Sequence, residues 1–312
     1  MELEIAVNVG LTVVGLVMLC YGGNWLVNGG VAIAKKFHIN NIIIGMTVVA
    51  YGTSTPELAA SIAAAGNHSE IILGNIIGSN IANIGMVIGI TAILTPLVAR
   101  RTTLRKEMPL MLGFSLLLII LSIDGIISQY DGIILISLLI AFTVYMYRTA
   151  KSQSKDDDDA NSPKKESYVR TLGLILVGVV LLYFGADLTV NNAVVIAQHV
   201  EISERIIGIT VIAIGTSLPE LLTSIIAIRK GHIDIGIGNI IGSNIYNILM
   251  IMGIVSMFAG VIVSDETFYD YVIMIGFSFG LMIAMMKKII TKKIGLAFSL
   301  LYVAYILSEF LV

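Results

Sequence analysis

The sequence is poor in charge and in cysteine. Only 13% of its 312 residues are charged and 57% are hydrophobic, which excludes an ordinary soluble domain and indicates several membrane-spanning segments. The single cysteine, Cys20, excludes an intrachain disulfide. The sequence also lacks a His-Glu-X-X-His motif, a phosphate-binding loop and a nucleophile paired with a base. We therefore expect neither an enzyme nor a bound cofactor.

Ten apolar segments are long enough, or nearly long enough, to cross a bilayer. They cover residues 4–33, 41–66, 71–99, 107–123, 131–148, 169–198, 205–228, 233–263, 270–286 and 291–311. Eighteen of the nineteen Lys and Arg residues follow odd-numbered segments, and only Arg205 falls on the other side. Because positive charge gathers in cytoplasmic loops, this bias predicts an all-α, multi-pass protein of the cell membrane. We expect ten transmembrane helices with the N- and C-termini outside.

A motif in the first half of the chain recurs in the second half. Gly-Thr-Ser-Thr-Pro-Glu at 52–57 returns as Gly-Thr-Ser-Leu-Pro-Glu at 215–220, and Gly-Asn-Ile-Ile-Gly-Ser-Asn-Ile follows each copy. Each copy belongs to a set of five segments, and because five is odd the two sets enter the membrane from opposite sides. This predicts two inverted five-helix repeats, residues 1–150 and 169–312, with a shared site at their interface.

The connection between the two halves has a different composition. Residues 151–168 are dense in Lys, Ser and Asp and contain few apolar side chains. Such a segment cannot bury enough apolar surface to fold, so we interpret it as a charged cytoplasmic linker. Four consecutive aspartates at 156–159 lack the spacing around a turn that a folded calcium site requires.

Glu57 and Glu220 are the only carboxylates deep in the four repeated segments, and they occupy matching positions. An ionisable group in a membrane is costly unless it faces the protein interior and meets a partner. Repeated Gly and Ser motifs can serve as packing surfaces between helices, but packing does not account for two buried glutamates. The pair predicts one cation site that both repeats share.

Neutral oxygens accompany each glutamate. Thr53 and Ser54 lie one helical turn before Glu57 and on its face, and Pro56 releases the carbonyl group four residues before it. The second copy repeats this arrangement with Thr216, Ser217 and Pro219 before Glu220.

The following segments pair a serine with an asparagine on one helical face, namely Ser79 with Asn83 and Ser243 with Asn247. This oxygen set suits a hard cation, Ca²⁺ above all, and its neutral members could hold Na⁺.

Other polar residues of these segments are assigned lesser roles. We expect four further asparagines to support the site rather than to bind the ion: Asn75, Asn80, Asn239 and Asn244. Asp187 lies in the sixth segment without a matching carboxylate in the first half, and we expect it to be paired or close to an interface.

More than one transport function fits these residues. Two buried glutamates could exchange protons for Ca²⁺, so an H⁺/Ca²⁺ antiporter is the alternative to Na⁺/Ca²⁺ exchange. The Thr-Ser pairs favour Na⁺, because neutral hydroxyls bind Na⁺ and contribute little to proton exchange. An ion channel also fits at this point. The expected partners are Ca²⁺, Na⁺ or H⁺, and the lipid bilayer, with no nucleic acid and no obligate protein partner.

The paired motifs resemble the two alpha-repeats of the sodium/calcium exchangers, within the cation/calcium antiporter superfamily. The match is to the prokaryotic type without a regulatory domain, with alpha-repeats at about 41–96 and about 205–260. This resemblance implies exchange of several Na⁺ for one Ca²⁺ by alternating access, in which the first and sixth helices slide past the core. It also implies that Glu57 and Glu220 bind Ca²⁺. The other implied ligands of Ca²⁺ and Na⁺ are Thr53, Ser54, Thr216, Ser217, Ser79, Ser243 and the carbonyl groups of Ala50 and Ala213.

The sequence departs from this family at one position. Many sodium-coupled members pair an Asn in the first repeat with an Asp in the second, whereas Asn83 and Asn247 are both amides. The site therefore has one fewer group that can carry negative charge. If that Asp is normally protonated, an amide is a fair substitute and sodium coupling survives.

Overall fold

The structure is a computed structural model that describes residues 2–66, 68–153, 168–199 and 213–309. The ten apolar segments are largely helical wherever they are described. Most of the predicted linker and the start of the seventh segment, residues 154–167 and 205–212, lie outside the described residues. Six described helices or helical runs are long and apolar enough to cross a membrane: Ile5–Phe37, Ser69–Leu94, Gln129–Ala150, Tyr168–Ile196, Ile233–Ala259 and Thr267–Met286.

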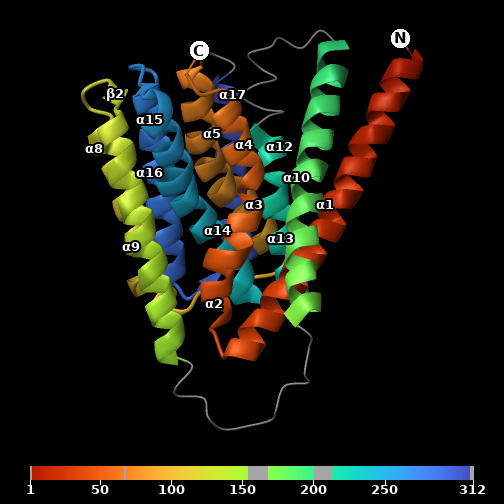
Figure 1. Cartoon of the computed structure of the whole chain (residues 1–312), viewed down its shortest axis with the longest axis vertical. Helices are drawn as coiled ribbons and strands as arrows, with labels where there is room; N and C mark the ends of the chain where they lie inside the picture. Colours follow the sequence, from red (N-terminus) through yellow and green to blue (C-terminus); the bar gives the residue numbers. More distant parts are fainter. Residues whose placement is uncertain (1, 67, 154–167, 200–212, 310–312) are drawn as a thin grey trace.

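Two long helices, α1 (Glu2–Phe37) and α10 (Tyr168–His199), lie side by side along one edge of the molecule (Figure 1). Glycines bring their backbones into contact. A Cβ atom on Gly22 would lie 2.9 Å from the carbonyl oxygen of Gly178, and one on Gly185 would lie 3.0 Å from that of Gly15. Small residues permit this approach between membrane helices. Only 17% of the apolar window of α1 and 28% of that of α10 are buried, so the pair lies outside the core.

The core consists of two interrupted helical runs from each half. The first half supplies α2 (Asn41–Ile44), η1 (Gly45–Val49), α3 (Ala50–Thr53) and α4 (Thr55–Ala63), then α5 (Ser69–Ala82), η2 (Asn83–Ile88) and α6 (Gly89–Leu94). The second half supplies α12 (Ala213–Thr216) and α13 (Leu218–Arg229), then α14 (Ile233–Tyr246), η4 (Asn247–Met252) and α15 (Gly253–Ala259). The apolar windows of the runs that begin with α5 and α14 are 83% and 89% buried, so these runs form the centre of the fold.

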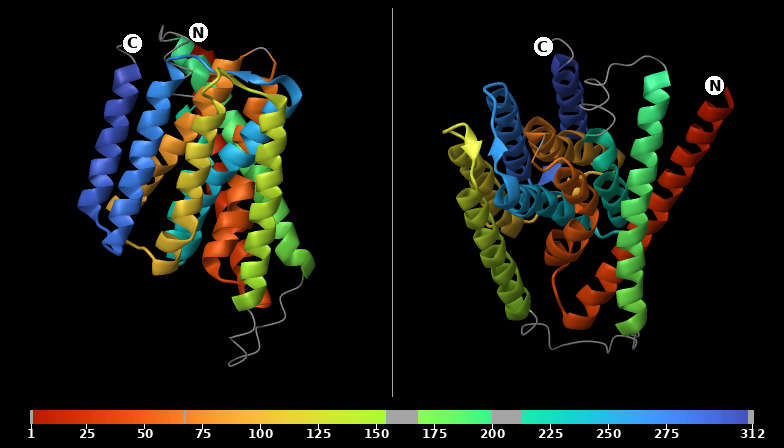
Figure 2. Two further views of the ribbon diagram at one scale, coloured as in Figure 1. Left: turned by 90° about the vertical axis from the view of Figure 1, so that its left-hand side faces the viewer. Right: turned by 45° about the horizontal axis from the view of Figure 1, so that its top comes forward.

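The remaining helices flank this core. They are α7 (Arg101–Arg105), α8 (Glu107–Leu121), α9 (Gln129–Gln153), α16 (Thr267–Met286) and α17 (Lys292–Glu309). Figure 2 shows α16 and α17 next to one another, where the rings of Phe277 and Phe298 stack with centroids 6.2 Å apart. Two short antiparallel ladders join the halves: β1 (Leu97–Val98) pairs with β4 (Ile289–Ile290), and β2 (Ile126–Ile127) pairs with β3 (Val261–Ile262).

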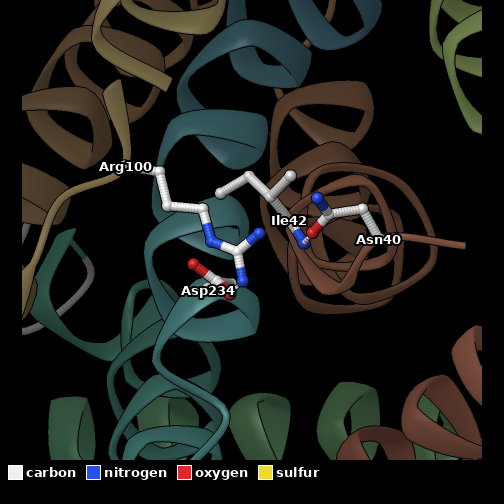
Figure 3. A network of polar contacts seen from close by, with 4 residues as sticks. All are labelled: Asn40, Ile42, Arg100 and Asp234. Atoms are coloured by element: carbon white, nitrogen blue, oxygen red, sulfur yellow. Dashed lines mark hydrogen bonds and ion pairs between the residues drawn. The ribbon is translucent and has the colours of Figure 1, made fainter. Parts of the chain in front are cut away.

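Polar contacts stabilise the N-terminal ends of two core helices, α2 and α14. The side-chain oxygen of Asn40 accepts a hydrogen bond from the N–H of Ile42 at 3.2 Å and caps α2. Arg100, just before α7, forms an ion pair with Asp234 in the first turn of α14 at 2.5 Å (Figure 3). A residue of the first half thus holds the beginning of a core helix of the second half.

Lys230 connects the end of α13 to the peripheral helix α1. Its ammonium group donates to the side-chain oxygens of Asn24 and Asn28, the latter at 2.6 Å. Burial lowers the pKa of Lys230 below its ordinary value. Burial also lowers the pKa of the neighbouring His232, and the positive charges of Lys35 and Lys230 lower it further. This contact joins the helix that carries Glu220 to α1.

Candidate functional site

Glu57 stands directly after an interruption in its helix. α3 ends at Thr53 and α4 begins at Thr55, and between them Ser54 has φ −81° and ψ 7°. Pro56 occupies the first turn of α4, where its missing N–H leaves no helical bond unmade. The helix is interrupted at Ser54, two residues before the proline that was expected to disturb it, and Glu57 lies in a first turn where the helix dipole favours negative charge.

Glu220 has the same local setting in the second half. Ser217, with φ −84° and ψ 0°, separates α12 from α13, and Pro219 lies in the first turn of α13. The side chain of Glu220 is 0% exposed and that of Glu57 is 1% exposed. Two carboxylates are therefore buried at equivalent helix N-termini, each produced by its own Ser-X-Pro-Glu sequence.

The partner residues lie on the two most buried runs. Ser79 belongs to α5 and Ser243 to α14, whereas Asn83 and Asn247 are the first residues of the π-helical turns η2 and η4. A π-helical turn has hydrogen bonds that span one residue more than those of an α-helix, and such turns are frequent at functional sites. The sequence did not signal these turns, because no change in the spacing of apolar residues marks where they begin.

Residues from both halves meet at Glu220. One oxygen of its carboxylate, Oε1, accepts hydrogen bonds from the hydroxyl groups of Ser54 and Ser243, both at 3.2 Å. The hydroxyl oxygens of Thr53 and Ser243 are 3.4 Å apart. The carboxyl group of Glu57 is close enough to Glu220 for the two to interact electrostatically. Two glutamates and three hydroxyl groups from the two halves therefore lie close together.

The buried oxygens of this cluster lack donors. Among the described residues, twelve buried side-chain N or O atoms have no hydrogen-bond partner. Seven of these are oxygens of predicted ion ligands: Glu57 Oε1 and Oε2, Ser79 Oγ, Asn83 Oδ1, Ser217 Oγ, Glu220 Oε2 and Asn247 Oδ1. A buried polar atom without a partner costs free energy, and most such atoms in proteins are paired. These unpaired oxygens belong to both halves of the chain, and a bound cation could supply the missing partners.

Three other predicted ligands have different surroundings. The hydroxyl of Thr216 donates to Asn75 Oδ1 at 3.4 Å. The carbonyl oxygen of Ala50 accepts from the N–H of Ser54 at 3.0 Å, so part of its capacity is already used. Ala213 begins α12, and its side chain is not described.

The charge of the site comes from the two glutamates. Within the described ranges, no group of three or more His, Cys, Asp or Glu residues is placed to hold a metal ion. Asp187 lies elsewhere, exposed on α10, where it accepts a hydrogen bond from Asn191 at 3.0 Å. Any cation at this site would be bound by two carboxylates and otherwise by neutral oxygens, a donor set that suits Ca²⁺ and Na⁺.

Comparison with known proteins agrees with this geometry. A family model described as sodium/calcium exchanger protein matches residues 7–148 and 170–311. Membrane protein MJ0091 of Methanocaldococcus jannaschii is 39% identical over 252 residues, which cover 80% of this chain and 82% of that protein. The sodium/calcium exchanger MaX1 of Methanosarcina acetivorans is 29% identical over 347 residues, covering 98% and 99% of the two chains.

Solved structures show the same fold. A structure of the sodium-calcium exchanger NCX_Mj soaked with Na⁺ and Sr²⁺ superposes on this chain with a TM-score of 0.85 and 33% sequence identity. The superposition covers 97% of this chain and 99% of the NCX_Mj chain. The matched family consists of membrane transporters rather than enzymes. The chain therefore belongs to the sodium/calcium exchanger family.

Proposed function

We propose that this protein is a secondary antiporter that exchanges Ca²⁺ for Na⁺ across the cell membrane. The observation that carries the proposal is the set of seven unpartnered, buried ligand oxygens, which come from both halves of the chain. Glu57 and Glu220 would together neutralise one Ca²⁺ ion. The neutral oxygens would hold Na⁺ once Ca²⁺ has left, because hydroxyl, amide and carbonyl oxygens are ligands for hard monovalent cations as well.

We assign the ion ligands as one set shared by the two repeats. The set comprises Glu57, Glu220, Thr53, Thr216, Ser54, Ser217, Ser79, Ser243, Asn83, Asn247 and the carbonyl groups of Ala50 and Ala213. Every member whose side chain is described is buried. Contacts of Thr53 and Ser54 with Ser243 and Glu220 support a site between the repeats rather than one in each repeat.

The proposed topology has ten transmembrane helices in two inverted five-helix repeats, residues 1–150 and 169–312. Residues 151–168 form the cytoplasmic linker, and both termini lie outside. The positive-charge bias supports this arrangement. The start of α1 and the end of α17 lie at one end of the molecule, and the end of α9 and the start of α10 lie at the other, as the topology requires (Figure 1).

Exchange would proceed by alternating access. The helices α1 and α10 are the elements expected to move, since they contact each other through glycines and are far less buried than α5 and α14. The two glutamates stay in the core. A sliding pair at the edge would open the site to one side of the membrane and then to the other.

Protons are the alternative counter-ion. Because Asn83 and Asn247 are amides, only Glu57 and Glu220 among the proposed ligands can take up a proton, so two protons per Ca²⁺ would be the limit of such an exchange. The unpartnered neutral oxygens of Ser79 and Ser217 favour Na⁺, because they have no use in proton exchange.

Flux measurements on reconstituted vesicles separate these functions. Vesicles are loaded with Ca²⁺ and diluted into medium with or without Na⁺, while the pH is clamped on both sides. Efflux that requires external Na⁺ is expected, and it should be lost in Glu220→Gln and retained in Glu70→Gln, an exposed control on α5. Efflux that follows an imposed pH gradient instead would establish the proton alternative, and efflux without either counter-ion would indicate a channel.

A further inference from the structure

Four buried asparagines lie on the two central helices beside the ion ligands. Asn75 and Asn80 belong to α5, and Asn239 and Asn244 belong to α14. Their side chains are between 0% and 6% exposed. Each of them reaches across the interface between the repeats to a predicted ion ligand of the other half. The ligands of each repeat are thus held by side chains of the opposite repeat.

The first pair of asparagines holds the threonines. Asn239 donates its amide N–H to the hydroxyl of Ser224 at 3.1 Å, which leaves its Oδ1 to accept from the hydroxyl of Thr53 at 3.0 Å. Asn75 mirrors this arrangement. It donates to Ser61 Oγ at 2.9 Å, and its Oδ1 accepts from Thr216 at 3.4 Å. The single hydroxyl hydrogen of Thr53 can also reach the carbonyl of Ala50 at 3.4 Å, but the contact with Asn239 is shorter. With that hydrogen directed to Asn239, the lone pairs of the Thr53 oxygen remain for another partner.

The second pair fixes the orientation of the carboxamide ligands. Asn80 Nδ2 donates to the backbone carbonyl of Asn244 at 3.4 Å, and a carbonyl can only accept, so this side of the Asn80 amide must be its NH₂ group. Asn80 Oδ1 therefore faces Asn247, whose Nδ2 donates to it at 3.0 Å. By the mirrored contacts, Asn244 Nδ2 donates to the carbonyl of Asn80 at 3.3 Å, and Asn244 Oδ1 accepts from Asn83 at 2.9 Å.

These contacts orient the donor groups of three predicted ion ligands in the same way. Each of Thr53, Asn83 and Asn247 directs a donor hydrogen to a supporting asparagine. The opposite atoms of the two amides, Asn83 Oδ1 and Asn247 Oδ1, are buried without a partner. A cation is repelled by N–H and O–H hydrogens and is bound by lone pairs. These contacts therefore turn groups that can donate or accept into groups that present only an acceptor.

We propose that Asn75, Asn80, Asn239 and Asn244 are positioning residues that take up the donor hydrogens of the ion ligands of the opposite repeat, so that only lone pairs face the cation. The inference deepens the proposed exchange function and rests on it. It also predicts that replacing an ion-ligand residue by one without a donor hydrogen destabilises the site, because the supporting asparagine then loses its hydrogen bond. An ionised aspartate in place of Asn247 would set its oxygen against Asn80 Oδ1, acceptor against acceptor.

A double-mutant cycle on the full chain tests the proposal. The variants are Asn239→Leu, Thr53→Val and their combination. The readout is the Ca²⁺ dissociation constant of the purified protein, obtained from the dependence of its unfolding temperature on Ca²⁺ concentration. We expect Asn239→Leu to weaken Ca²⁺ binding by about tenfold in the native background, and by less than about twofold in the Thr53→Val background, because its effect passes through the Thr53 hydroxyl. The inverted repeat supplies the control: with Thr216→Val, the effects should multiply independently, since Thr216 contacts Asn75 instead.

Each outcome of the cycle decides the proposal. Equal losses of affinity in the native and Thr53→Val backgrounds would mean that Asn239 acts only on the general packing, and they would overturn it. If Asn239→Leu does not yield folded protein, the cycle of Asn80→Ala with Asn247→Ala tests the other arm by the same criterion. Failure of the exchange function itself is seen separately, as the absence of any Ca²⁺ effect on the unfolding temperature of the native protein.

Discussion

Replacing Glu57 by Gln is predicted to have opposite effects on the empty and the Ca²⁺-bound protein. In the empty site, neither carboxylate oxygen of Glu57 has a hydrogen-bond partner among the described residues, and Glu57 and Glu220 repel each other when both are ionised. The amide of Glu57→Gln removes this repulsion and can donate to Glu220. We therefore expect the empty variant to unfold at a higher temperature, with a gain on the order of 1–3 kcal/mol, the cost of an unsatisfied buried group.

The Ca²⁺ response should be lost in the same variant. Removing one member of a buried charge pair costs about 2–5 kcal/mol, which corresponds to roughly 30- to 5000-fold weaker Ca²⁺ binding. At a Ca²⁺ concentration of about 100 times the native dissociation constant, bound ion stabilises the native protein by about 2.7 kcal/mol. In the variant this stabilisation falls below about 0.9 kcal/mol. Thermal unfolding in detergent with and without Ca²⁺ measures both effects.

Glu220→Gln is the matched comparison for Glu57→Gln. Glu220 already accepts hydrogen bonds from Ser54 and Ser243, so the empty protein should gain less stability from this change than from Glu57→Gln. The exposed Glu70→Gln should alter neither the unfolding temperature nor the Ca²⁺ response. A Glu57→Gln protein that is destabilised when empty, yet still strongly stabilised by Ca²⁺, would refute the reasoning.

Three further predictions concern helix contacts. Gly22→Ala should lower both thermal stability and flux, because its Cβ would lie 2.9 Å from a backbone carbonyl of α10. Gly173→Ala is the control and should be neutral, because a Cβ there would have no atom within 4 Å. Equal losses in the two variants would contradict the close packing of α1 on α10. Arg100→Gln, which breaks the ion pair with Asp234, should lower the free energy of unfolding by less than about 1 kcal/mol, since the Arg100 side chain is 48% exposed. A larger loss in thermal unfolding would show that the fold depends on this ion pair. In vesicle flux, Lys230→Gln should change the maximal rate of exchange but not the Ca²⁺ affinity, because the Lys230 ammonium group contacts Asn24 and Asn28 of α1. A change in Ca²⁺ affinity without a change in rate would exclude a role of this contact in the movement of α1.

The sequence predicted the helix interruptions and the two-glutamate cluster for a physical reason. Pro56 and Pro219 have no backbone N–H, and this constraint acts locally whatever the surrounding fold. Glu57 and Glu220 are costly in an apolar segment unless they meet a partner, so their matching positions already implied a common place in space. The resemblance to the exchangers rested on these same residues, and the family assignment is confirmed.

Other features could not be read from the sequence. Glu57 and Glu220 follow nearly identical motifs, yet Glu220 has two hydrogen-bond donors and Glu57 has none. Identical local sequences in inverted repeats meet different neighbours when the two repeats adopt unequal conformations, and no local pattern encodes that difference. The asparagines were expected to support the site, but their crossing between repeats, such as Asn239 to Thr53, depends on how the halves dock.

The length of α1 has a consequence for the membrane itself. Its 36 residues make a helix about 54 Å long, whereas the hydrocarbon layer of a bilayer is about 30 Å thick. The helix is inclined relative to α10 (Figure 1), and inclination is one way in which an overlong helix fits a bilayer. Because most of the apolar window of α1 is not buried in the protein, the thickness of the bilayer would act directly on the element proposed to slide. Exchange measured in vesicles of short-chain and long-chain lipids should therefore differ in rate, and the lipid would be part of the transport mechanism.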